Sequence, residues 1–125
     1  MTSLKKPLTR YNQQATLFKS LAHPARLGII DVLRTGEACV CHLEAALGYR
    51  QAYISQQLSV LKDAGLITDR RDGKYIYFSI RQEKLHEMIR QSTLLLGVND
   101  PEPPPAPALC TCPKCNPESG SGCCD

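Results

Sequence analysis

The stretch CVCHLEAALGYRQAYISQQLSVLKDAG, residues 39–65, decides the fold of this chain. It contains two segments of helical composition on either side of Gly48, and Gly65 ends the second one. In the second segment, apolar residues recur at helical spacing and predict a buried stripe of Ile54, Leu58 and Leu61. Two helices joined by a short turn that contains glycine are typical of a helix-turn-helix.

A β-hairpin is expected after this pair. Residues 66–71 and 75–81 are rich in β-forming side chains, and they flank Asp72-Gly73-Lys74, a strong turn signal. From Tyr75 onward the side chains alternate with the period of two that a half-buried strand requires. Amphipathic patterns predict further helices over residues 10–22, 24–34 and 82–97. We therefore predict a mainly α fold with a small β-hairpin, ordered α-α-α-α-β-β-α. This is a winged helix-turn-helix with an extra helix at each end.

Composition divides the chain into four parts. Residues 1–9 are a polar N-terminal arm, residues 10–98 the folded domain, residues 99–109 a proline-rich linker, and residues 110–125 a cysteine-rich tail. Residues 1–100 carry 14 Lys and Arg against 9 Asp and Glu, which suits a polyanionic partner.

The compartment follows from what the sequence contains and lacks. No apolar run is long enough for a membrane span, and the N-terminus has no signal-peptide pattern. Seven cysteines without a secretory signal favour a reducing cytoplasm, where thiols bind metals or undergo redox reactions more often than they form structural disulfides. We see no pairing of nucleophile and base, so an enzyme is not expected.

The sequence resembles the ArsR/SmtB family of metal-responsive repressors over about residues 10–97. The resemblance rests on four segments in order: LAHPARLGIIDVL (21–33), GEACVCHLEAALG (36–48), AYISQQLSVLKDAGLI (52–67) and DRRDGKYIYFSI (69–80). The Cys-Val-Cys element is similar to the arsenical and cadmium branches. The resemblance implies a homodimeric repressor that leaves its operator DNA when a metal ion binds.

Three positions depart from the family pattern. Glu44 stands where the best-known arsenical repressors have a third cysteine, and residues 1–38 hold none of the N-terminal cysteines of cadmium-type members. The last helix offers only His86 with Glu83 and Glu87, in place of the paired Asp and His ligands of the zinc-type site.

The Cys39–Cys41 pair is the expected metal site. Side chains two residues apart in a regular helix point about 200° apart, so Cys39 must lie at or before the first turn for both sulfurs to reach one ion. A helix N-terminus also favours the thiolate form. As(III) needs a third sulfur and Cd(II) or Zn(II) a fourth. The tail offers the candidates Cys110, Cys112 and Cys115, with Cys123 and Cys124 beyond them. These could complete the site, from either protomer, or form a separate clamp.

The DNA-contacting residues are expected on two surfaces. The second helix of a helix-turn-helix enters the major groove, where Gln pairs with adenine and Ser binds bases or phosphates. Basic residues of the hairpin contact phosphate. The candidates are Arg50, Gln51, Tyr53, Ser55, Gln56 and Ser59 on the helix side, and Arg70, Arg71 and Lys74 on the hairpin.

The preferred function is a homodimeric repressor released by As(III) or Sb(III), with Cd(II), Pb(II) or Zn(II) as alternative ions. The first and last helices should form the dimer interface, with Phe18 and Leu94–Leu96 contributing apolar surface. Two alternatives stay open: a thiol-redox repressor in which Cys39 and a tail thiol form a disulfide, and a metal-buffering protein whose helical domain only dimerises.

Overall fold

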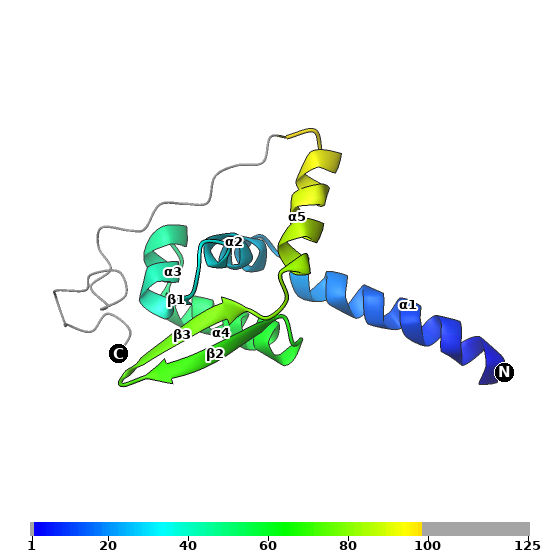
Figure 1. The fold of residues 1–125 in the computed structure, drawn as a ribbon, viewed down its shortest axis with the longest axis horizontal. Helices are drawn as coiled ribbons and strands as arrows, with labels where there is room; N and C mark the ends of the chain where they lie inside the picture. The colour runs from blue at the N-terminus through cyan, green and yellow to red at the C-terminus, as the bar shows by residue number, and fades with distance from the viewer. Residues whose placement is uncertain (1, 99–125) are drawn as a thin grey trace.

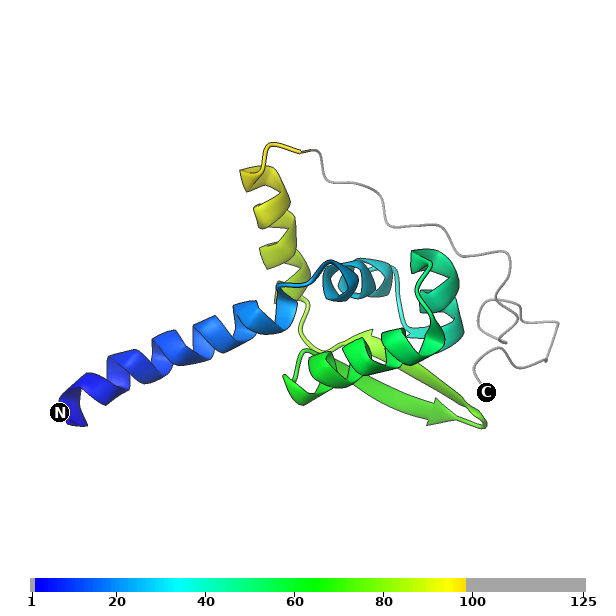
Figure 2. The ribbon, with the colours of Figure 1, turned by 180° about the vertical axis from the view of Figure 1, so that it is seen from behind.

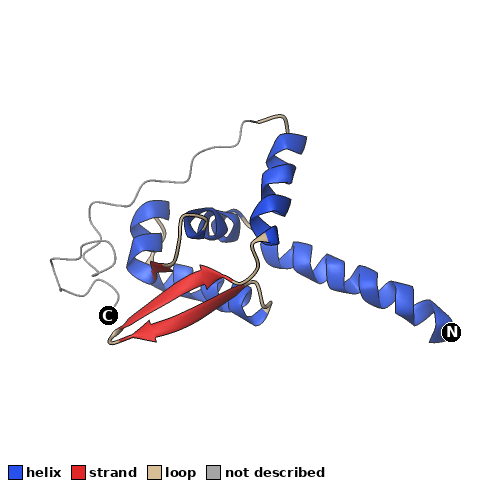
Figure 3. Cartoon of the chain, viewed as in Figure 1, coloured by secondary structure: helices blue, strands red, loops and turns tan. Residues whose placement is uncertain are grey.

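A computed structural model describes the backbone of residues 2–98 and the side chains of residues 9–98. Figure 3 shows a mainly helical chain with one small sheet. The elements are α1 (Thr2–Leu21), α2 (Pro24–Leu33), β1 (Ala38–Cys39), α3 (Val40–Leu47), α4 (Gln51–Asp63), β2 (Ile67–Asp72), β3 (Tyr75–Ile80) and α5 (Lys84–Leu95). The predicted fold class, a winged helix-turn-helix with an extra helix at each end, is confirmed.

The helix-turn-helix consists of α3 and α4. Gly48 ends α3 with φ 79°, a left-handed conformation that glycine adopts without strain. Arg50 is extended and α4 begins at Gln51. The buried stripe of α4 is as predicted: Ile54, Leu58 and Leu61 are all buried in the core.

The hairpin of β2 and β3 turns at Gly73, whose φ is 64°. The sheet has a third strand that the sequence did not predict: β1 pairs antiparallel with the other edge of β3, which gives the order β1-β3-β2. Burial on β3 is also less regular than a period of two, because Phe78 is buried as well as Tyr75 and Tyr77. The two faces of β3 are therefore both partly covered.

Helix α2 packs in the middle of the molecule. Its buried residues include Ile29, Ile30 and Leu33, whereas Leu27 is exposed. A Cβ atom added at Gly28 would lie 3.0 Å from a methyl carbon of Leu47, so α2 and α3 approach closely at this point. The helix-turn-helix of α3 and α4 is thus packed closely against α2.

Helices α1 and α5 project away from this body (Figures 1 and 2). Helix α1 begins at Thr2, so the helix predicted over residues 10–22 extends through most of the polar N-terminal arm. Residues 9–16 are all exposed, so no buried face marks where α1 begins. No described helix is long and apolar enough to cross a membrane. The expected linker and tail, residues 99–125, lie outside the described residues.

Candidate functional site

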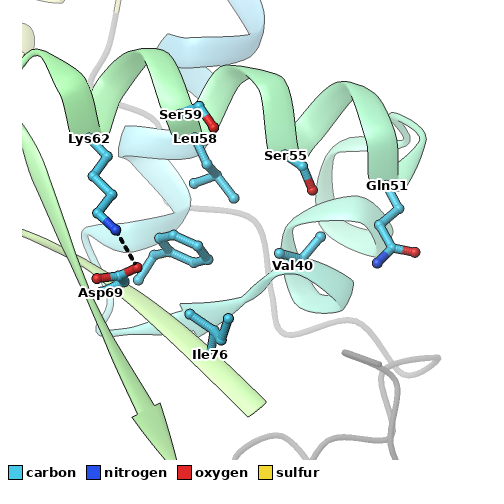
Figure 4. A pocket seen from close by; sticks show the side chains of 9 residues that line it. Val40, Gln51, Ser55, Leu58, Ser59, Lys62, Asp69 and Ile76 are labelled. Carbon is cyan, nitrogen blue, oxygen red and sulfur yellow. Dashed lines mark hydrogen bonds and ion pairs between the residues drawn. The ribbon is translucent and has the colours of Figure 1, made fainter. Parts of the chain in front are cut away.

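One side of α4 faces the hairpin across a cleft of about 330 Å³ (Figure 4). Gln51, Ser55 and Ser59 follow one another at intervals of four residues along this side. Val40, Leu58, Ile76 and Phe78 supply the apolar lining. Gln56 is exposed on the same helix. Four of the predicted base-contact residues thus lie on the open surface of α4, and three of them border one cleft.

Lys62 was missed by the sequence reasoning. It lies one turn beyond Ser59 on the same cleft, and its ammonium donates a hydrogen bond of 2.8 Å to Asp69 of β2. This ion pair joins α4 to the hairpin. The spacing of eleven residues from Gln51 puts Lys62 on the same helix face and would have pointed to it.

Tyr53 differs from the other DNA-contact candidates on α4, because it is half-buried and its hydroxyl is hydrogen-bonded within the protein. Its hydroxyl oxygen lies 3.1 Å from His23 Nε2. The centroid of its ring lies 5.1 Å from the centroid of the Tyr49 ring. His23 Nδ1 accepts a hydrogen bond from the backbone N–H of Ala25, so the neutral ring carries its proton on Nε2 and donates it to Tyr53. These contacts give Tyr53 a structural role in holding α4 against the start of α2.

The basic residues of the hairpin are not equivalent. Arg71 and Lys74 are exposed near the turn, and Arg50 is exposed at the start of α4. Arg70 is instead paired with Glu37: its Nε donates a hydrogen bond of 2.8 Å to one carboxylate oxygen, and a terminal nitrogen binds the other. This hydrogen bond raises the pKa of Arg70. Arg70 thus already has an ion-pair partner, although its side chain is 53% exposed, and its phosphate contact stays a prediction.

The thiol pair lies where the last residue of β1 meets α3. Cys39 is the N-cap residue of α3, with φ −87° and ψ 169°, so its backbone is extended as the two-sulfur site requires. The two thiols differ in access: Cys39 is 0% exposed, whereas Cys41 is half-buried and lines a separate hollow with Glu44 and Tyr49. The expected two-sulfur site would therefore need Cys39 to become accessible.

The described part of the chain does not hold a complete metal site. Within residues 2–98, no group of three or more His, Cys, Asp or Glu side chains is placed to hold a metal ion. His42, next to Cys41, is half-buried, and this burial lowers the pKa of its ring. Two soft sulfur donors fit a thiophilic ion but do not complete its coordination. Cys110, Cys112 and Cys115 lie outside the described residues.

Comparison with known proteins identifies the family. Residues 23–69 match the family model described as "Bacterial regulatory protein, arsR family". The "Biofilm growth-associated repressor" of Agrobacterium fabrum is 40% identical over 99 residues, which cover 70% of this chain and 85% of that protein. The "Arsenical resistance operon repressor" of Escherichia coli is 45% identical over 65 residues, which cover 51% of this chain and 56% of that protein.

Solved structures agree with this match. The structure of NolR from Sinorhizobium fredii has a TM-score of 0.69 at 28% identity, covering 75% of this chain and 94% of that one. A homodimeric winged helix-turn-helix DNA-binding domain from Mycobacterium bovis has a TM-score of 0.67 at 29% identity, covering 74% of this chain and 85% of that one. Sequence, fold and helix-turn-helix geometry together make this chain a transcriptional repressor of the ArsR/SmtB family.

Proposed function

We propose that this repressor binds operator DNA as a homodimer and is released when As(III) or Sb(III) binds Cys39 and Cys41. The observation that carries the proposal is the extended N-cap backbone of Cys39, two residues before Cys41 and directly before the helix pair. A bound ion would draw both thiolates together at the N-terminus of α3. Because α3 packs against α4, this movement would disturb the DNA-binding surface.

The third sulfur is proposed to come from the tail, with Cys110 or Cys112 as the preferred ligand and Cys115 next. Glu44 borders the same hollow as Cys41, but its carboxylate is a hard donor that suits a thiophilic ion poorly. The similarity to the arsenical repressor of Escherichia coli supports this class of inducer. Cd(II), Pb(II) or Zn(II) would need a fourth ligand, which the tail cysteines also offer.

On the DNA side, we assign base contacts to Gln51, Ser55, Gln56 and Ser59. Arg50, Arg71 and Lys74 are assigned to phosphate contacts, which position the protein without reading sequence. These seven residues are exposed on α4, at its start, or at the hairpin turn. The Lys62–Asp69 ion pair links the two surfaces.

The test measures operator binding by fluorescence anisotropy while arsenite is added in the presence of a non-thiol reductant. Wild-type protein should dissociate, whereas Cys41→Ser and Cys39→Ala should bind DNA normally and stay bound. Alanine is used at position 39 because a buried serine hydroxyl would need a new partner. Release of both variants at wild-type arsenite concentrations would place the sensing site elsewhere. Release that requires an oxidant would favour the disulfide alternative.

A further inference from the structure

The unpredicted strand β1 connects the thiol pair directly to the wing, which we define as residues 67–80. In the sheet, Cys39 lies opposite Tyr77 of β3, and Tyr77 in turn lies opposite Arg70 of β2. Cys39 and Arg70 therefore flank the same residue, one on each side of the central strand. A displacement of Cys39 acts on the backbone ladder of the wing.

Side-chain contacts also connect the segment before β1 to the wing. Glu37 is one residue before β1, and its carboxylate holds the Arg70 guanidinium through two of its nitrogens. That guanidinium also lies over the Tyr77 ring, with 5.0 Å between its central carbon and the ring centroid. The Glu37 side chain is 20% exposed, so one partner of this ion pair is largely shielded from water. Residues 37–39 and the wing are thus joined at both the backbone and the side-chain level.

We propose that the Glu37–Arg70 pair is a positioning contact that makes the wing move with the thiol pair, so that ion binding weakens DNA binding through the wing. The inference rests on the proposed function for its inducer. Cys39 is fully buried beside β3, so an ion reaches its sulfur only when β1 shifts. Because Glu37 and β1 are both bound to the wing, that shift displaces Arg71 and Lys74, which lie next to Arg70 or at the turn.

The structure supplies a matched control in a second ion pair on the same strand. Asp69, the neighbour of Arg70 on β2, accepts a hydrogen bond from Lys62 of α4. Asp69→Asn and Glu37→Gln each remove one negative charge and one ion pair to β2. Only the Glu37 substitution removes the side-chain contact between the thiol-pair segment and the wing. If Glu37→Gln changes a measured property and Asp69→Asn does not, the change comes from the lost Glu37–Arg70 contact and not from the altered charge near the wing.

The first measurement needs no ion: backbone hydrogen exchange at Ala38 and Cys39 in the full-length protein. Glu37→Gln should speed this exchange about fivefold, because the backbone pairing of β1 with β3 is then no longer stabilised by the Glu37–Arg70 ion pair. Arg70→Gln should do the same, and the double variant should add nothing further. Asp69→Asn should leave exchange at the wild-type rate. Unchanged exchange in Glu37→Gln and Arg70→Gln would overturn the proposal.

The second measurement is the ratio of operator Kd with arsenite to Kd without it, over a salt series. For the wild type, arsenite should flatten the salt dependence, because phosphate contacts of the wing are lost. Glu37→Gln should lower the ratio about tenfold, and Asp69→Asn should keep it. A wild-type ratio in Glu37→Gln would overturn the proposal. A wild type that ignores arsenite while the exchange result holds would refute the proposed inducer and still support the connection between β1 and the wing.

Discussion

At the scale of single residues, existing partners separate side chains that look alike in the sequence. Arg70 and Arg71 are neighbours of equal charge, yet Arg70 is held by Glu37. In the same way, Tyr53 is bonded to His23, whereas Ser55 and Gln56 are exposed on the same helix. We expect the DNA contacts at residues whose side chains face the cleft or solvent.

This division predicts two kinds of binding defect. Gln56→Ala should weaken operator binding by about 1–3 kcal/mol and relax sequence preference, because a base contact is lost. Lys74→Ala should weaken operator and random DNA alike and lower the salt slope by about one, because a phosphate contact is lost. Anisotropy titrations with both DNAs over a salt series check this. If each substitution affected the two DNAs equally, the assignment of Gln56 as a base contact would be wrong.

At the scale of elements, Arg26 of α2 ties α1 to α4. Its Nε donates a hydrogen bond of 2.8 Å to Gln57, and a terminal nitrogen donates to the carbonyls of Lys19 and Ser20 at the end of α1. Gln57 is 8% exposed and is the buried polar residue of the described core. One guanidinium thus adds a polar link between α4 and a helix that projects from the body.

Arg26→Leu should lower the free energy of unfolding by about 1–3 kcal/mol, because Gln57 then loses its partner in a buried place. Urea unfolding followed by circular dichroism measures the change. Adding Gln57→Leu to the variant should restore part of the loss, since no polar group is then left without its partner. A double variant that is as unstable as the sum of both single variants would show that the two residues act independently.

The elements that the sequence predicts well are those that local chemistry defines. Gly48 and Gly73 have positive φ and end or turn the chain as expected, and the apolar stripe of α4 is buried. Strand β1 was not predicted, because a strand of two residues is too short to show an alternating pattern of apolar and polar residues. It is defined by its pairing with β3. The Arg70–Glu37 pair was not predicted either, because its two residues are 33 positions apart in the sequence. Long-range partners have no local signature.

At the scale of the whole molecule, α1 and α5 expose apolar side chains. Phe18 is 54% exposed, and Leu94, Leu95 and Leu96 near the end of α5 are also exposed, Leu95 at 89%. Apolar surface of this kind on two projecting helices fits an interface between two copies of the chain. The Mycobacterium bovis domain of the same fold is a homodimer.

Phe18→Glu and Leu95→Glu should therefore each convert the dimer to a monomer and weaken operator binding. Leu27→Glu is the matched control, because Leu27 is an exposed leucine on α2 and should leave the dimer intact. Sedimentation velocity on the full chain gives the oligomeric state. Dimeric Phe18→Glu and Leu95→Glu proteins would place the interface on another surface.

The tail belongs to the same scale, since it is proposed to supply the third sulfur. Truncation after Pro107 removes every cysteine except Cys39 and Cys41. The truncated protein should bind DNA normally but need much more arsenite, because a free thiol must replace a ligand held nearby at high effective concentration. X-ray absorption of the full-length complex should show about three As–S bonds. An unchanged arsenite response after truncation would make the tail a separate clamp.

If the proposed ion binds Cys39 and Cys41, the unequal exposure of the two thiols sets the order and the rate of binding. Cys41 is half-buried, whereas Cys39 is fully buried at the end of β1, so on the proposed coupling Cys39 would bind second, after β1 separates from β3. An ion held by Cys41 alone is weakly bound and escapes if the strand stays closed. Above saturation of Cys41, more ion cannot hasten the second step, since strand opening then limits the rate. The protein would thus ignore brief pulses of a toxic ion and answer only an exposure that outlasts its own opening time.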